Sequence, residues 1–145
     1  IEHPLTVYTE ENQFRLFLFD VGLLGALSGL DPGKILDYDY GTYKGFFAEN
    51  FISQEFAYAD KRMDRIFTWK SDSGAEIEFL REIDGEVLPI EVKSGSNTKA
   101  KSLRVFAEKY HSRYRTIMSA NNLNIDKENK VHRYPLYLAS KFPLI

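Results

Sequence analysis

The chain has 145 residues, of which 43% are hydrophobic and 28% are charged, proportions typical of one globular domain with a core of its own. Its lack of cysteine excludes disulfides, thiolate zinc sites and cysteine nucleophiles, and it favours a reducing, cytoplasmic compartment. A membrane helix is not expected, because Arg15, Asp20 and several glycines interrupt the most apolar stretch, residues 14–30, and prevent an uninterrupted run of about 20 residues.

The first forty residues predict little regular structure. The chain begins with Ile1 and shows no signal peptide, so we expect a piece of a longer polypeptide whose residues 1–12 form a connecting segment. Residues 14–19 are typical of a strand, and Asp20 is placed to cap a helix over residues 21–30. Asp31-Pro32-Gly33 predicts a turn.

The middle of the chain has the clearest patterns. Residues 43–60 carry apolar side chains at helical spacing and predict a long helix with a wide apolar face. Residues 65–70, 75–81 and 87–93 each predict a strand, and the turn residues between them predict an antiparallel meander of three strands.

The last third returns to alternating helix and strand. Apolar residues at i, i+3, i+4 and i+7 predict a helix around residues 103–110, followed by a strand over residues 114–120. Residues 121–130 are polar and predict a loop, residues 131–134 a short strand, and residues 135–140 a turn or helix begun by proline. The expected fold class is α/β, with a mixed central sheet flanked by helices.

Ionisable residues stand at four positions where burial is expected. Glu49 lies close to the apolar face of the long helix, where a carboxylate is costly without a partner or a cation. Glu78 is in the middle of the meander, and Glu91 and Lys93 share one face of the next strand at i, i+2. We therefore expect these four side chains to converge.

Clustered carboxylates provide the hard oxygen ligands that Mg²⁺ or Mn²⁺ requires, and these ions keep waters for a phosphate and a nucleophile. This arrangement is suited to phosphodiester hydrolysis, in which a neighbouring lysine stabilises charge in the transition state. The alternative interpretation is a structural Glu–Lys network without activity. A Glu-x-Lys triplet alone is weak support for catalysis, since it is common by chance.

The helical Glu49, followed by Glu78 and by Glu91-Val92-Lys93, resembles the PD-(D/E)xK nuclease superfamily, and the order helix, three-strand meander, helix, strand resembles its restriction-endonuclease-like core. A closer resemblance is to a domain of unknown function that follows the AAA module in prokaryotic, archaeal-type ATPases. The segments that carry it are residues 15–24, 47–51, 73–79 and 89–95.

The resemblance implies roles for these residues. Glu49, Glu78 and Glu91 would be metal ligands with the Val92 carbonyl as a further ligand, and Lys93 the catalytic base or electrostatic helper. Members of this family more often carry aspartate where this chain has Glu78. The resemblance also implies that residues 1–12 link to an upstream ATPase region and that residues 13–145 are the nuclease-like domain. The chain has no G-x-x-x-x-G-K-[ST] motif, so we expect no ATP site in it.

Charge is unevenly distributed along the chain. Acidic residues dominate the first sixty positions, whereas residues 93–115 are mostly basic. Lys99, Lys101 and Arg104 on the second long helix are the predicted contacts to a DNA backbone, the alternative being an ordinary solvated helix face. The three histidines follow no ligand spacing, so we expect none of them to bind metal.

Two functions follow from the sequence. The preferred one is a C-terminal nuclease-like domain of an AAA-family ATPase, with Mg²⁺-dependent hydrolysis of DNA. The alternative is a non-catalytic module that binds DNA or a protein and couples it to the ATPase. The expected partners are DNA, the AAA module of the same polypeptide and, because AAA modules commonly assemble as rings, further copies of the chain; no membrane is expected.

Overall fold

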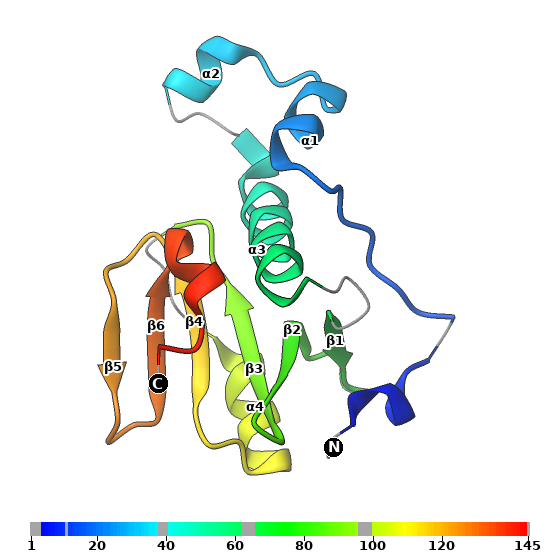
Figure 1. Cartoon of the computed structure of the whole chain (residues 1–145), viewed down its shortest axis with the longest axis vertical. Coiled ribbons are helices and arrows are strands. Elements are labelled where there is room, and N and C mark those ends of the chain that lie inside the picture. The colour runs from blue at the N-terminus through cyan, green and yellow to red at the C-terminus, as the bar shows by residue number, and fades with distance from the viewer. Residues whose placement is uncertain (1–3, 11, 38–40, 62–65, 96–99, 145) are drawn as a thin grey trace.

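A mixed six-stranded sheet forms the centre of the molecule (Figure 1). The computed structural model describes residues 4–10, 12–37, 41–61, 66–95 and 100–144. The strand order is β1-β2-β3-β4-β6-β5, with β3, β4 and β6 parallel and the other neighbours antiparallel. The strands are β1 Phe67–Lys70, β2 Glu76–Ile83, β3 Glu86–Val92, β4 Arg115–Ser119, β5 Asn124–Asp126 and β6 Val131–Pro135.

Helices cover both faces of this sheet. α3 and η4 pack on one face, whereas α4 packs on the other, against β2, β3 and β4; Figure 1 shows α1 and α2 at the far end of α3, away from the sheet. The helices are η1 Leu5–Tyr8, α1 Val21–Leu27, α2 Pro32–Leu36, η2 Gly41–Tyr43, α3 Lys44–Asp60, α4 Lys101–Tyr110 and η4 Leu136–Lys141. The predicted α/β class with a mixed sheet flanked by helices is confirmed.

The predicted three-strand meander is β1–β2–β3. Asp84 and Gly85 form the turn between β2 and β3 with φ of 52° and 78°, the left-handed pair that a two-residue hairpin requires. Between β1 and β2 the register shifts, so that Thr68 lies opposite two residues of β2, Glu78 and Phe79. This bulge places Ile77 in the core on the α4 side and Phe79 in the core on the α3 side.

The long predicted helix is confirmed as α3, and it packs by its apolar face. Ile52 and Phe56 are fully buried, and the ring of Phe56 meets that of Phe79 edge to face at 5.6 Å. The guanidinium of Arg81 lies 4.5 Å above the ring of Phe56 and pairs with Asp60 at the end of the helix. The orientation of α3 on the sheet is therefore set by both packing and charge.

The second core lies under α4. Leu103 and Phe106 are buried against β1 and β2, and the indole of Trp69 contacts Phe106 edge to face at 5.1 Å. Leu5 of η1 joins this core, and its backbone N–H donates to the side chain of Glu82. Part of residues 1–12 thus packs on the domain; whether the segment links to an upstream module stays a prediction.

Three predicted elements were wrong. Residues 14–19 form no strand: the segment is extended but pairs with no strand of the sheet, because side chains of α3 take its backbone groups. Asp31-Pro32-Gly33 begins α2, with the Asp31 carboxylate capping Gly33 N–H and proline in the first turn. The predicted loop over residues 121–130 contains the edge strand β5.

The helix α1 ends earlier than predicted. Asp20 caps α1 by accepting from Leu23 N–H, as predicted, but the helix ends at Leu27 because Gly29 adopts a left-handed conformation with φ of 65°. Arg65, expected to begin β1, lies outside the described residues. Among the helices that the structure describes, none is long and apolar enough to cross a membrane.

Candidate functional site

The candidate site lies where β2 and β3 part. The two strands pair from Ile83 opposite Glu86 up to Phe79 opposite Ile90, and the ladder stops there. β3 continues alone along β4 as far as Val92, after which Lys93 N–H donates to the Met118 carbonyl at 2.8 Å. The side of β3 that faced β2 is therefore open from Glu91 onward.

Glu78 fills this opening with its carboxylate. It accepts a hydrogen bond from Val92 N–H at 3.3 Å, which places the carboxylate level with the backbone of β3. Burial, and after it the negative charge of Glu91, raises the pKa of Glu78 to about 7. Near neutral pH this side chain is thus about equally ready to hold a proton or to accept a cation in its place.

Glu91 and Lys93 form a close pair beside Glu78. The Lys93 Nζ donates to Glu91 Oε1 at 2.5 Å, as the predicted i, i+2 placement on one face requires. Glu91 is buried, and its Oε2 has no hydrogen-bond partner among the residues that the structure describes. A buried carboxylate oxygen without a donor is costly, so this oxygen is available for a further cation.

Glu49 approaches the same region from α3. Desolvation raises its pKa, while Arg15 and Lys93 lower it and Glu91 raises it again. Lys93 and Glu91 also act on the pKa of Glu78, so the Glu91–Lys93 pair lies within electrostatic reach of both Glu49 and Glu78. The structure thus places Glu49 and Glu78 each near the Glu91–Lys93 pair; the roles of the four residues as ligands and catalytic groups stay a prediction.

Three further residues adjoin the cluster that the sequence did not indicate. Arg15 donates to Glu49 Oε2 at 3.1 Å and to Glu76 Oε2 at 3.0 Å, and so connects α3 to β2. Lys70, opposite Glu76 in the β1–β2 pair, lies 2.9 Å from its other oxygen and is the main cause of its lowered pKa. The only available signal was that Glu76 and Glu78 stand at i, i+2 on one strand.

The carboxylates of the cluster meet part of what a divalent cation requires of its ligands. In the portion of the chain that the structure describes, no three His, Asp or Glu side chains are grouped closely enough to hold one ion together. Two carboxylates do fit: Glu91 presents a buried oxygen with no donor, and Glu78 carries a raised pKa that a cation would relieve. Glu49, the third predicted ligand, is instead held by Arg15.

Two of the three predicted DNA contacts, Lys101 and Arg104, lie on α4. Lys101 and Arg104 are both exposed, and Arg104 pairs with Glu108 one turn further along the helix at 3.7 Å. Lys99 lies outside the described residues. In the chain, α4 is the next described element after β3.

The histidines lie elsewhere. His111 is exposed at the end of α4, where it adopts the left-handed conformation that closes the helix. His132 is buried in β6 with its ring stacked on Tyr114 at 3.9 Å, and burial lowers its pKa. His3 lies outside the described residues.

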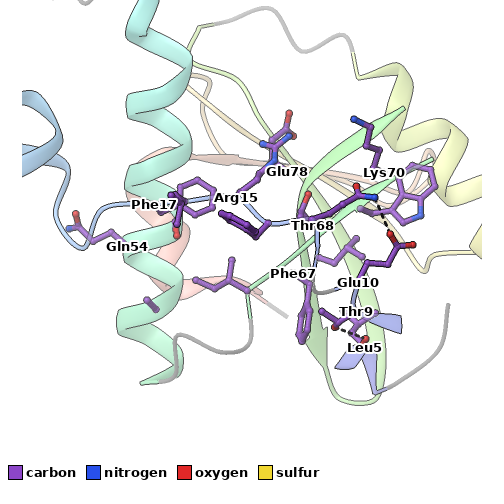
Figure 2. Close-up of a pocket in the computed structure, with 18 of the residues that line it drawn as sticks. Leu5, Thr9, Glu10, Arg15, Phe17, Gln54, Phe67, Thr68, Lys70 and Glu78 are labelled. Atoms are coloured by element: carbon purple, nitrogen blue, oxygen red, sulfur yellow. Dashed lines mark hydrogen bonds between the residues drawn. The ribbon is translucent and has the colours of Figure 1, made fainter. Parts of the chain in front are cut away.

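A large hollow opens next to the cluster. Its volume is about 1330 Å³, and it lies between the extended N-terminal residues, the outer side of α3 and the edge strand β1. Figure 2 shows Arg15 and Glu78 among its lining residues, together with Phe17 and Gln54. The candidate site is therefore reached from an open space that the N-terminal segment borders.

Comparison with known families finds a match over more than half of the chain. The model of a family described as Domain of unknown function (DUF4143) matches residues 44–138, which span α3, the whole sheet and the first half of η4. Glu49, Glu78, Glu91 and Lys93 all fall within this range. No curated protein and no solved structure was found to match the chain.

Proposed function

We propose, from the premise that this chain belongs to the DUF4143 family, that its carboxylate–lysine cluster binds Mg²⁺ or Mn²⁺ and hydrolyses phosphodiester bonds of DNA. The family description names no activity, so the support comes from the chemistry of the side chains. The finer fold proposal, a restriction-endonuclease-like core, rests on the resemblance to PD-(D/E)xK nucleases and on the order of α3, the meander, α4 and β4.

The observation that carries the proposal is the unpartnered oxygen of Glu91. A structural Glu–Lys network is expected to satisfy both oxygens of a buried carboxylate, because an unsatisfied one costs roughly 1–3 kcal/mol. Here Glu91 Oε1 is bonded by Lys93 and Oε2 is buried with no donor, next to the raised-pKa carboxylate of Glu78. This arrangement favours a site built for a cation.

Each side chain then has a distinct task. Glu78 and Glu91 hold the ion, which when bound lowers the pKa of a coordinated water and offsets negative charge on the phosphate. Lys93, fixed by Glu91, places its ammonium beside that position and stabilises the charge that develops on the phosphate oxygens. Val92 contributes its N–H to the orientation of Glu78, and its carbonyl is the proposed additional ligand.

DNA is the proposed substrate because of the charge around the site. A polyanion can approach a cluster of carboxylates only if positive charge lies nearby, and Lys101 and Arg104 are exposed on α4. Contacts of this kind bind the backbone without reading sequence. We place this activity in a domain that follows an AAA ATPase module in a cytoplasmic prokaryotic protein, as the resemblance of residues 15–24 and 89–95 implies.

The proposal is tested by release of acid-soluble fragments from linear duplex DNA with Mg²⁺, with Mn²⁺ and with EDTA. Glu91→Gln and Lys93→Met each remove one charge from the cluster and are expected to lower the cleavage rate at least 100-fold, within the range that such groups contribute. Glu128→Gln, which removes an exposed carboxylate from the turn between β5 and β6, is the matched control and should retain the wild-type rate. Equal cleavage by all variants would indicate a contaminating nuclease and refute the assignment.

One observation favours a second function, a non-catalytic module that binds DNA or a protein for the ATPase. Among the described residues no group of three carboxylates is disposed around one ion, and Glu49 is neutralised by Arg15. Under this alternative, DNA binding is independent of divalent ions and unaffected by Glu91→Gln, and no fragments are released. Fluorescence anisotropy with labelled DNA in EDTA separates the two functions.

A further inference from the structure

Arg15 pairs with Glu49, the carboxylate that was predicted as the third ligand of the proposed metal site. Its two terminal nitrogens bond Glu49 and Glu76, from two elements that are 34 and 61 residues away from it in the chain. The side chain of Glu49 is only 23% exposed, and the Arg15 guanidinium lies 3.1 Å from its Oε2. Arg15 therefore does for Glu49 what a bound cation does for a ligand carboxylate.

Arg15 is carried by a segment with few attachments, residues 15–21, which we name the N-terminal strap. The strap forms no ladder with the sheet. Leu18 N–H donates to Asn50 Oδ1 at 2.7 Å, Asn50 Nδ2 donates back to the Leu18 carbonyl at 3.2 Å, and Val21 N–H donates to Gln54 at 2.9 Å. Three hydrogen bonds between the strap backbone and side chains of α3 thus replace the strand pairing that the sequence of this segment predicts.

Apolar packing of the strap is slight. Phe17 contacts Phe79 with ring centroids 5.6 Å apart, whereas Leu16 and Phe19 are exposed. The strap borders the hollow of about 1330 Å³, and Figure 2 shows Phe17 and Arg15 on that side. Because two of its large apolar side chains are exposed, we expect the strap to open locally before the sheet unfolds.

We propose that Arg15 is a built-in counter-ion that competes with the divalent metal for Glu49, so that the N-terminal strap controls metal loading of the site. With the strap docked, Glu49 is paired with Arg15 and the site offers two carboxylates, Glu78 and Glu91. With the strap released, Glu49 becomes the third ligand. This inference rests on the proposed metal site and adds its regulation.

Charge explains why docking and metal binding oppose each other. An ion that takes Glu49 as a ligand must displace the Arg15 guanidinium from that carboxylate, and Arg15 paired with Glu49 in turn lowers the affinity of the site for the ion. By linkage, the metal weakens strap docking by the same factor by which the docked strap weakens metal binding. Regulation of this kind requires an element with two states whose equilibrium the ligand shifts; here the element is the strap, and its states are docked and released.

The test is the dissociation constant for Mn²⁺ of the whole chain, measured by the electron paramagnetic resonance signal of the free ion at pH 7.5. Arg15→Gln is expected to tighten Mn²⁺ binding about tenfold, the factor that corresponds to 1.4 kcal/mol. Arg113→Gln is the matched control, because it removes the same charge from an exposed pair with Glu86 and should change affinity less than about twofold.

Two further variants tie the effect to its cause. Added to Glu49→Gln, the Arg15→Gln change should no longer tighten binding, since the carboxylate in dispute is gone. Gln54→Ala removes the acceptor of Val21 N–H and should tighten binding in the same direction as Arg15→Gln, by loosening the strap with Arg15 intact. Circular dichroism verifies that each variant is folded.

The outcomes separate this inference from the proposed function. If wild type binds Mn²⁺ and Arg15→Gln binds it equally or less tightly, the metal site stands and the role of Arg15 is refuted. If neither wild type nor Arg15→Gln binds Mn²⁺, while both are folded, the metal site and its regulation are both refuted. Tightening that persists in the Glu49→Gln background also refutes the competition.

Discussion

Replacement of Glu78 by glutamine tests the electrostatics of the site in the metal-free protein. The introduced amide oxygen can still accept from Val92 N–H, so the change removes a charge and keeps the hydrogen bond. Burial, together with Glu91, raises the pKa of Glu78 from 4.5 to about 7 in the folded state. At about 1.4 kcal/mol for each pKa unit, the ionised side chain costs the fold about 3 kcal/mol.

The direction of the pH dependence of stability follows from the difference in the number of protons bound by the folded and unfolded states. Below pH 4.5 Glu78 is protonated in both states and has no such cost; between pH 4.5 and about 7 the folded state binds more protons, so wild-type stability falls as pH rises. The Glu78→Gln variant does not lose stability in this way, because its amide side chain does not titrate. Relative to its value at pH 4, the stability difference between variant and wild type should grow by about 3 kcal/mol at pH 8, or roughly 10 °C in Tm.

The assay is urea denaturation in EDTA at several pH values between 4 and 8. Glu108→Gln, which removes an exposed carboxylate, is the control and should show no such pH dependence. Added Mn²⁺ should restore wild-type stability at pH 8 and have little effect on Glu78→Gln. A stability difference between Glu78→Gln and wild type that does not change with pH would refute the reasoning.

Two other changes probe how α3 is held. Asp60→Asn removes the partner of the buried Arg81 guanidinium and should cost about 3 kcal/mol by urea denaturation, because an uncompensated charge stays in the core; a loss below about 1 kcal/mol would contradict the pairing. Asn50→Ala leaves both backbone groups of Leu18 without their α3 partner, and amide exchange should accelerate along the strap while the sheet stays protected. Uniform acceleration in strap and sheet alike would show that the strap has no independent opening.

Much of the fold could be predicted because its signals are local. The apolar spacing in residues 43–60, the Asp84-Gly85 turn and the alternation around Glu91 each specify an element without reference to the rest of the chain. The strand predicted at residues 14–19 failed for the opposite reason. Its composition suits a strand, but Asn50 supplies the backbone pairing, and no local pattern shows that a helix side chain will do so.

The residues of the candidate site could be predicted from the sequence, but their arrangement in space could not. Glu49, Glu78, Glu91 and Lys93 could be named because carboxylates and a lysine stand where burial is expected. The parting of β2 from β3 after Phe79 and Ile90 lies level with the bulge opposite Thr68, and only the paired strands reveal both. Arg15 could not be assigned, because its two partners are brought to it by tertiary contacts.

Anomalous scattering from crystals soaked in Mn²⁺ tests most directly whether the parting of β2 and β3 is a cation site. The account predicts one strong peak at roughly 2.0–2.3 Å from an oxygen of Glu78 and from Oε2 of Glu91. Crystals of Arg15→Gln should add an oxygen of Glu49 to these ligands. Manganese bound only elsewhere, or none at saturating concentration with Glu91 Oε2 still unpartnered, would contradict the account.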